Sequence, residues 1–410
     1  MTETIAVNAI QNGTIRPMTL TLRDGRAEAL LPRQPAAGES QTLYLSDGFI
    51  DSHAHVYDGA TDLGVSADRI GYQTGVHLVV DAGSAGAINF PCFRDYVMPA
   101  HETPVLAFLN ISRVGLVTKQ PYFDPRVIDV AAAVQALKAH GGQKLLGIKV
   151  LSSGLVVEKA GLEPLRAGVQ AARECGVPVM VHLVEGPPAN EDTMPMLQKG
   201  DIITHCFHGA PNLEANRKAS RGAALNLEFC SVPNVMWNPD GTPVKPLEEA
   251  LNRGVYLDVG HGAGSLDMDV ARCAIAAGAR NFSISSDAHI RNVEGVVRSL
   301  PHVMSKFLAL GMTLEQVIDS VTRIPARQLG IQDWCGHPLE RATLFALRPV
   351  RPEDGAFLDA YKRPVPVTQV IEPKAVIRGG RLSNCRQAIK EGPYGGDSNP
   401  GRAGIPDRAG

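Results

Sequence analysis

One stretch of the chain decides the fold and points to its chemistry: residues 48–55, which read GFIDSHAH. The apolar start of this stretch predicts a buried strand, and its end carries two histidines. Residues two apart on a strand point the same way, so His53 and His55 can present both imidazoles to one metal ion while Ala54 faces away. Two histidines alone are a weak signal, and the weight of this pair depends on the residues that follow it.

The composition is that of a globular protein. With 410 residues, 44% apolar and 20% charged, the chain is long enough for one large barrel-like domain and a smaller one. Its 40 lysines and arginines nearly balance 42 aspartates and glutamates, and no basic run is dense enough for a nucleic-acid or membrane surface. We therefore expect a small-molecule substrate, no nucleic-acid partner and no membrane partner. A homo-oligomer is a separate expectation.

Compartment and cysteine chemistry follow from simple absences in the sequence. The first residues lack a positively charged and apolar leader, and no uncharged apolar run approaches the roughly 20 residues of a spanning helix. We therefore expect a cytoplasmic protein. The seven cysteines are odd in number and form no C-x-x-C pair, so neither a disulfide framework nor a thiolate zinc site is expected.

The two ends of the chain have the pattern of short strands. Alternating runs at 4–10, 15–22 and 42–45 are separated by turn sequences, and further runs follow at 343–347, 367–371, 375–377 and 381–382. Neither end can bury a sizeable core alone, so we expect residues 1–47 and 343–390 to pair into one small β-sandwich. Residues 391–410, rich in glycine and proline, predict a mobile tail.

The middle of the chain, residues 48–342, repeats an apolar β-rich run that ends at a polar residue and gives way to a helical pattern. The eight runs are 48–55, 77–83, 104–112, 145–152, 177–185, 201–208, 255–261 and 281–289. Clear helical patterns between them cover 127–140, 164–175, 269–277 and 296–310. Eight β/α units with strands apolar on both faces predict a (β/α)8 TIM barrel, in which chemistry lies at the C-terminal strand ends.

Those strand ends carry residues that bind metals. The set comprises His53 and His55 on the first strand, Lys149 on the fourth, His182 on the fifth, His205 on the sixth and Asp287 on the eighth. Imidazole nitrogen and carboxylate oxygen suit borderline ions, most plausibly zinc, so the set predicts a site for one or two metal ions. A single histidine at a strand end is more often structural, but six coincident candidates favour the metal site.

These residues resemble motifs of the amidohydrolase superfamily of metal-dependent hydrolases, and the likeness spans nearly the whole chain. The stretch 48–55 resembles the first-strand motif, Val181-His182 and Thr204-His205 the histidines of the fifth and sixth strands, and Ser286-Asp287 the aspartate of the eighth. Residues 204–209 (THCFHG) and 258–262 (DVGHG) resemble the deacetylase-like branch, also described as dihydroorotase-like. Residues 313–317 and 322–330 are similar to the segment that closes the barrel in this superfamily.

The resemblance implies a dinuclear centre with a modified lysine. By the family pattern, His53, His55 and Asp287 hold one metal and His182 and His205 the other. Lys149, as N6-carboxylysine, and a hydroxide bridge the two ions. The physics is consistent, because a buried ammonium beside two dications would be strongly disfavoured, whereas a carbamate supplies an oxygen to each ion.

A mechanism and further candidates follow from that pattern. Two metals lower the pKa of a bridging water, and Asp287 accepts its proton and delivers it to the leaving group. His208 and His261, at the sixth and seventh strand ends, are candidates for orienting ligands or stabilising the oxyanion. The alternative for each is a core histidine. Arg113, just beyond the third strand, is a candidate for binding a substrate carboxylate, with a surface arginine as the alternative.

The substrate is the least constrained part of the prediction. True dihydroorotases resemble H-x-H-x-R, whereas this chain has Tyr57 at the arginine position. We therefore predict a deacetylase-like, metal-dependent hydrolase that cleaves an amide or ester bond of a small acylated amino or hydroxy acid. The alternatives are a cyclic amide or imide hydrolase and a non-catalytic scaffold on a hydrolase fold. Such scaffolds lose metal ligands, whereas all six positions are filled here.

Overall fold

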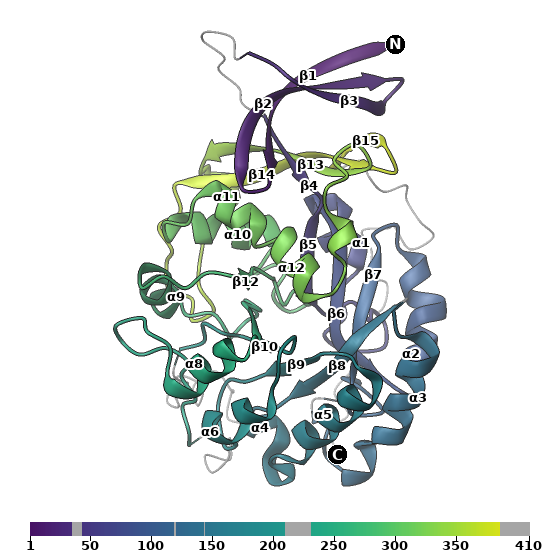
Figure 1. The fold of residues 1–410 in the computed structure, drawn as a ribbon, viewed down its shortest axis with the longest axis vertical. Helices are drawn as coiled ribbons and strands as arrows, with labels where there is room; N and C mark the ends of the chain where they lie inside the picture. The colour runs from purple at the N-terminus through teal and green to yellow at the C-terminus, as the bar shows by residue number, and fades with distance from the viewer. Residues whose placement is uncertain (35–42, 119, 143, 210–230, 386–410) are drawn as a thin grey trace, which may run out of the picture.

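The fold consists of two sheets built from different parts of the chain. A computed structural model of the protein describes residues 1–34, 43–118, 120–142, 144–209 and 231–385. Figure 1 shows a small sheet made from both ends of the chain at the top of the molecule, with a larger barrel and its helices below it.

The barrel has eight parallel strands, and each predicted run overlaps one of them. In chain order they are β5 (Phe49–Ala54), β6 (Val76–Gly86), β7 (Val105–Asn110), β8 (Leu145–Leu151), β9 (Val179–His182), β10 (Ile202–Thr204), β11 (Tyr256–Asp258) and β12 (Phe282–Ser283). Each strand pairs in parallel with the next. Beyond β12, the amide of Asp287 donates to the carbonyl of His53 at 2.7 Å, which links the eighth strand end back to the first. The predicted eight-stranded parallel barrel is confirmed.

Helices follow the barrel strands and pack on their outer side. They are α1 (Ala67–Ile70), α2 (Phe90–Cys92), α3 (Val130–His140), α4 (Gly154–Val157), α5 (Glu163–Cys175), α6 (Asn190–Thr193), α8 (Lys245–Asn252), α9 (Met268–Ala276), α10 (Leu300–Ala309), α11 (Leu314–Asp319) and α12 (Arg323–Gln328). Local sequence sets their limits. Helix α5 has Pro164 in its first turn, where a missing N–H costs nothing, and it ends at Gly176 in the left-handed conformation.

The small sheet takes strands from both ends of the chain. Its strands are β1 (Thr2–Gln11), β2 (Thr14–Arg23), β3 (Arg26–Pro32), β4 (Leu43–Asp47), β13 (Arg341–Pro349), β14 (Gln369–Arg378) and β15 (Arg381–Asn384). Their order is β1-β2-β3-β15-β14-β13-β4, and β4 pairs with β1 to close the sheet. Its interior is a separate core that includes Val7, Leu20, Leu45 and Ile377.

The two ends of the chain therefore combine as predicted, although not in the predicted form. A β-sandwich is not confirmed, because the seven strands form a single sheet that closes on itself. Strand β3 was not predicted, and the runs at 367–371 and 375–377 belong to one strand, β14. The predicted tail, 391–410, lies outside the described residues.

The length of the helices and the pairing of cysteines are two further features of the chain. Across the ranges that the structure covers, no helix is long and apolar enough to cross a bilayer. Six of the seven cysteines fall in those ranges, and all six are free thiols.

Candidate functional site

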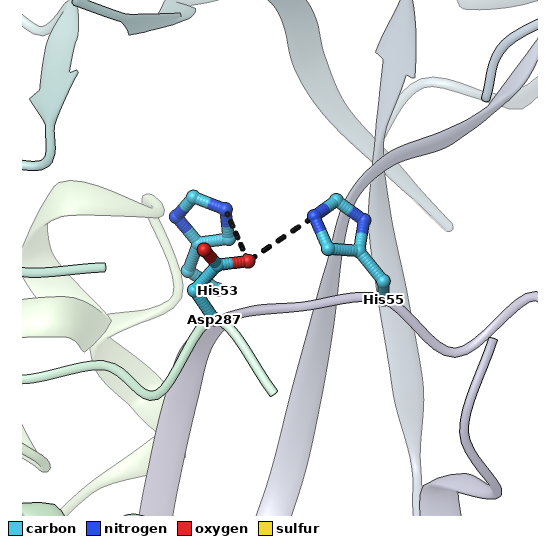
Figure 2. A group of neighbouring side chains, drawn as sticks. All are labelled: His53, His55 and Asp287. Carbon is cyan, nitrogen blue, oxygen red and sulfur yellow. Dashed lines mark ion pairs between the residues drawn. The ribbon is translucent and has the colours of Figure 1, made fainter. Parts of the chain in front are cut away.

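All six predicted ligands meet in one pocket at the C-terminal ends of the barrel strands. The pocket has a volume of about 290 Å³, and its lining includes His53, His55, Lys149, His182, His205 and Asp287. Figure 2 shows three of them turned toward one another. Oδ1 of Asp287 lies 3.2 Å from Nε2 of His55 and 3.6 Å from Nε2 of His53. One ligand atom from each of these three residues lies within 4.8 Å of the other two.

The other half of the cluster is joined to the first through Lys149. Its Nζ lies 3.4 Å from Nε2 of His53, and the lysine is only 2% exposed. The ring of His205 lies 5.2 Å from that of His53 and 4.3 Å from that of His182, measured between ring centroids. Strands far apart in the sequence thus bring four imidazoles, one amine and one carboxylate into a single buried group.

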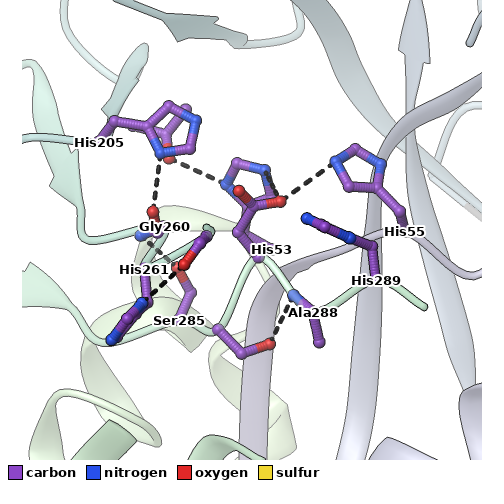
Figure 3. A network of polar contacts seen from close by, with 12 residues as sticks. His53, His55, His205, Gly260, His261, Ser285, Ala288 and His289 are labelled. Atoms are coloured by element: carbon purple, nitrogen blue, oxygen red, sulfur yellow. Dashed lines mark hydrogen bonds and ion pairs between the residues drawn. The ribbon is translucent and has the colours of Figure 1, made fainter. Parts of the chain in front are cut away.

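Hydrogen bonds behind the imidazoles orient them. Nδ1–H of His205 donates to the carbonyl of Gly260 at 2.7 Å, as Figure 3 shows. Nδ1 of His55 pairs with the hydroxyl of Ser84 at 2.9 Å, and Nδ1 of His53 bonds outward as well. The Nδ1 atoms are used away from the cluster, which leaves the Nε2 atoms free for it. Metal-binding histidines are oriented in this way.

Burial and neighbouring charges keep three of the imidazoles and the carboxylate in the form that binds a cation. Burial lowers the pKa of His53 and His205, and lowers that of His182 to about 3, so these three imidazoles are neutral at pH 7. Burial alone would raise the pKa of Asp287, but the neighbouring His53 holds it well below its usual value, and the carboxylate stays ionised. Burial also lowers the pKa of Lys149 to about 8.

Two of these residues have a strained backbone. His205 has φ 66° and Asp287 has φ 47°, in the left-handed region that residues other than glycine rarely adopt. Each such residue costs on the order of 1–3 kcal/mol and persists where the surrounding structure holds it, often at functional sites. The backbone of Gly83 also packs closely against Lys149. A Cβ placed on Gly83, which has φ 84°, would lie 2.6 Å from Cβ of Lys149.

Solved structures with the same architecture include two that cover almost the whole chain. One is a crystal structure of a dihydroorotase, 27% identical, with a TM-score of 0.74 over 94% of this chain and 99% of that one. Another is a crystal structure of an adenine deaminase, 26% identical, with a TM-score of 0.76 over 92% and 98% of the two chains. No family model matches the sequence.

Curated relatives at the sequence level carry the name deacetylase. Deacetylase Atu3266 of Agrobacterium fabrum is 32% identical over 74% of this chain and 71% of its own length. A deacetylase of Brucella anthropi is 33% identical over 70% and 67%, and one of Enterococcus faecalis is 28% identical over 91% and 94%. The chain belongs to the amidohydrolase superfamily, on its deacetylase-like branch.

Three residues predicted for this amidohydrolase do not reach the pocket. Arg113, His208 and His261 are absent from its lining. The Arg113 side chain pairs with Asp129 at 3.6 Å and is 41% exposed, which agrees with the alternative of a surface arginine. His208 and His261 are fully buried, and Figure 3 shows the His261 ring turned away from His53.

Other residues of the amidohydrolase line the pocket although they were not predicted. They include Asp62, His289 and Arg291, and Arg291 forms an ion pair with Asp62. A usable signal was present in the sequence, since 289 and 291 follow Asp287 at a spacing of two. The cationic side chain that lies beside the predicted metal ligands is therefore Arg291 and not Arg113.

Proposed function

We propose that this protein is a metal-dependent hydrolase that cleaves an amide or ester bond of a small acylated amino or hydroxy acid. The observation that carries the proposal is the buried convergence of His53, His55 and Asp287, with ligand atoms within 4.8 Å of one another. The name of the relatives, deacetylase, supports an acyl group as the part that is removed.

The residues present fit two metal ions. His53, His55 and Asp287 would hold one ion and His182 and His205 the other, because neutral imidazoles and an ionised carboxylate are the forms that ligate. Imidazole nitrogen and carboxylate oxygen together suit zinc, which is bound in this way in catalytic sites. Bound zinc would lower the pKa of water and polarise the substrate carbonyl.

Lys149 fits the role of a carboxylated bridge. Burial lowers the pKa of its amine to about 8, so near neutral pH a fraction of the amine is unprotonated and can add carbon dioxide to form a carbamate. The product is an anion with two oxygens, and it removes the cost of a buried ammonium that has no carboxylate within ion-pair distance among the described residues. Its place beside Nε2 of His53 supports the bridge.

Asp287 is suited to move a proton. Its side chain is ionised, 13% exposed and part of the pocket lining, so it can meet both the attacking water and the leaving group. It takes the proton of the water as general base and returns it to the leaving nitrogen or oxygen as general acid. Both transfers use the same carboxylate, and no second acid is required.

Arg291 is the residue that best fits the carboxylate of the substrate. Its guanidinium lines the pocket and already pairs with one carboxylate, that of Asp62. A substrate acid group could form a two-pronged contact with this guanidinium while its acyl carbonyl lies toward Asp287. A pocket of about 290 Å³ accommodates only a small molecule of this kind.

A cyclic amide or imide hydrolase is the second candidate, because one solved structure of similar fold is a dihydroorotase at 27% identity. The position that separates the two is Tyr57. Its ring is buried and stacks on Phe93 at 4.7 Å, and its hydroxyl donates to the carbonyl of Asn89, so it offers no cation to a substrate acid. This observation favours the acyclic substrate.

Substrate screening tests the proposal. Zinc-loaded protein is incubated with N-acetyl and O-acetyl derivatives of amino and hydroxy acids of both hands, with their methyl esters, and with dihydroorotate and hydantoin. Release of acetate from the free acids is the expected result. Turnover of the cyclic compounds alone would replace the proposal with the second candidate.

A further inference from the structure

The seventh strand supplies none of the six proposed ligands, yet it lies directly behind them. Asp258, the last residue of β11, is fully buried. Its Oδ2 accepts hydrogen bonds from Nδ1 of His53 at 3.2 Å and from the hydroxyl of Thr204 at 2.7 Å. Its Oδ1 accepts from the hydroxyls of Ser52 at 3.0 Å and Ser283 at 2.6 Å. One carboxylate thus joins four strands of the barrel.

The positions of the protons in this network determine the tautomer of His53. The hydroxyl of Thr204 donates its one proton to Asp258, so toward Nδ1 of His53, 2.9 Å away, its oxygen can only accept. Both neighbours of Nδ1 are therefore acceptors, and the ring proton has to be on Nδ1. The lone pair is then on Nε2, which faces Lys149 and Asp287. Asp258 selects the tautomer that can ligate.

The residues after Asp258 set the tautomer of a second ligand, His205, and lie in close contact with His205 and Asp287. The carbonyl of Gly260 requires the proton of His205 to be on Nδ1. A Cβ on Gly260 would lie 2.7 Å from that nitrogen, and one on Gly262 would lie 2.4 Å from Oδ2 of Asp287. Because both glycines have positive φ, 49° and 55°, no other residue type fits here without strain.

Residues 258–262, which lie behind the proposed ligands, are held in place from the outside of the barrel by a buried lysine. Lys306 of α10 is fully buried, and its Nζ donates to Nε2 of His261 at 2.7 Å and to the carbonyls of Val296 and Leu358. His261 accepts that bond because its own proton is on Nδ1, which donates to the carbonyl of Gly262. His261 therefore anchors the segment and does not face the pocket.

We propose that Asp258 is a positioning residue that sets the tautomer and direction of His53 and, through Thr204, ties it to the sixth strand, so that metal affinity depends on it. The inference rests on the proposed metal-dependent function. Partners of this kind behind a ligand typically change metal affinity about 10–100-fold when they are replaced.

Zinc affinity of the metal-free protein, measured by competition with a chromogenic chelator, tests the inference without using activity. The variant Asp258→Asn keeps the shape of the side chain and removes its charge. We expect its zinc affinity to fall about 10–100-fold. Asp201→Asn is the matched control, because Asp201 is an equally buried carboxylate whose side chain bonds to Arg173 and to the amides of Val179 and Gln198, and to no histidine. Its affinity should stay within about threefold of the unaltered protein, a change below 1 kcal/mol.

Thermal unfolding of each metal-free variant separates positioning from folding. If Asp258→Asn is unfolded when metal-free, Thr204→Val replaces it, since valine removes the oxygen that accepts from His53 and leaves Asp258 in place. That variant should also bind zinc more weakly. Unchanged zinc affinity in the folded variant would overturn the inference while leaving the proposed function intact. Failure of the unaltered protein to bind zinc would instead overturn the proposed function, and this inference with it.

Discussion

Replacing Lys149 by methionine should stabilise the metal-free protein, although the lysine is central to the proposed function. Lys149 is 2% exposed, and burial lowers its pKa from 10.5 to about 8. Each pKa unit corresponds to about 1.4 kcal/mol, so at pH 7 the buried ammonium costs the metal-free folded state about 3 kcal/mol. Methionine has a similar length and no charge. Metal-free Lys149→Met should therefore be more stable than the unaltered protein by about this amount.

The pH dependence gives the prediction its sign. The folded state releases the proton of Lys149 at a lower pH than the unfolded state, so between pH 8 and 10.5 the unfolded state binds more protons. Stability of the metal-free protein then rises with pH through this window, and Lys149→Met lacks that rise. The difference in free energy of unfolding between the two metal-free proteins should therefore have its full value at pH 7 and be much smaller at pH 9.5.

Urea unfolding with a chelator present, at pH 7 and at pH 9.5, measures both quantities. Lys138→Met is the control, because Lys138 is 62% exposed and pairs with Glu174, so its loss should change stability by less than about 0.5 kcal/mol. With zinc and bicarbonate added, the unaltered protein should gain stability and Lys149→Met should gain far less. A metal-free Lys149→Met protein that is less stable than the unaltered one at pH 7 would refute the reasoning.

Three further predictions concern turnover, specificity and packing. Asp287→Asn should keep most of its metal and lose turnover by about 10²–10⁴-fold, measured on one sample; a rate that falls only in proportion to metal would make Asp287 a ligand alone. Arg291→Met should raise KM for acidic substrates about 10–100-fold and spare their methyl esters, while Arg113→Ala should stay within about twofold; the opposite pattern would return the carboxylate site to Arg113. Gly83→Ala, at φ 84° against Lys149, should lower stability by about 1–3 kcal/mol in urea, and an unchanged midpoint would contradict the packing.

The barrel was predictable because its strands are buried on both faces and end at polar residues. Even β12, with two residues, lies inside a run that the apolar pattern indicated. Strand β3 was missed, since its sequence RAEALLP alternates poorly and is half-buried or exposed along its length. Whether the terminal strands form a sandwich or a closed sheet depends on pairings such as that of β4 with β1, which local pattern does not encode.

The pocket was predictable to the extent that the position of a residue along a strand determines the direction of its side chain. The six proposed ligands lie near the C-terminal ends of barrel strands and meet as expected. Arg113 follows β7 by three residues, but its amide bonds to the carbonyl of Val127 and its side chain turns to Asp129. Asp258 was overlooked as a site residue because its partners, Ser52 and His53, lie more than 200 residues away in the sequence.

The central claim is that the six clustered residues hold two metal ions. Elemental analysis of the natively purified protein, repeated after incubation with zinc and bicarbonate, tests it most directly. Six donors including a bridging carbamate exceed what one tetrahedral ion can use, so we predict about two ions per chain, mainly zinc. A stoichiometry that stays near zero after that incubation would contradict the account.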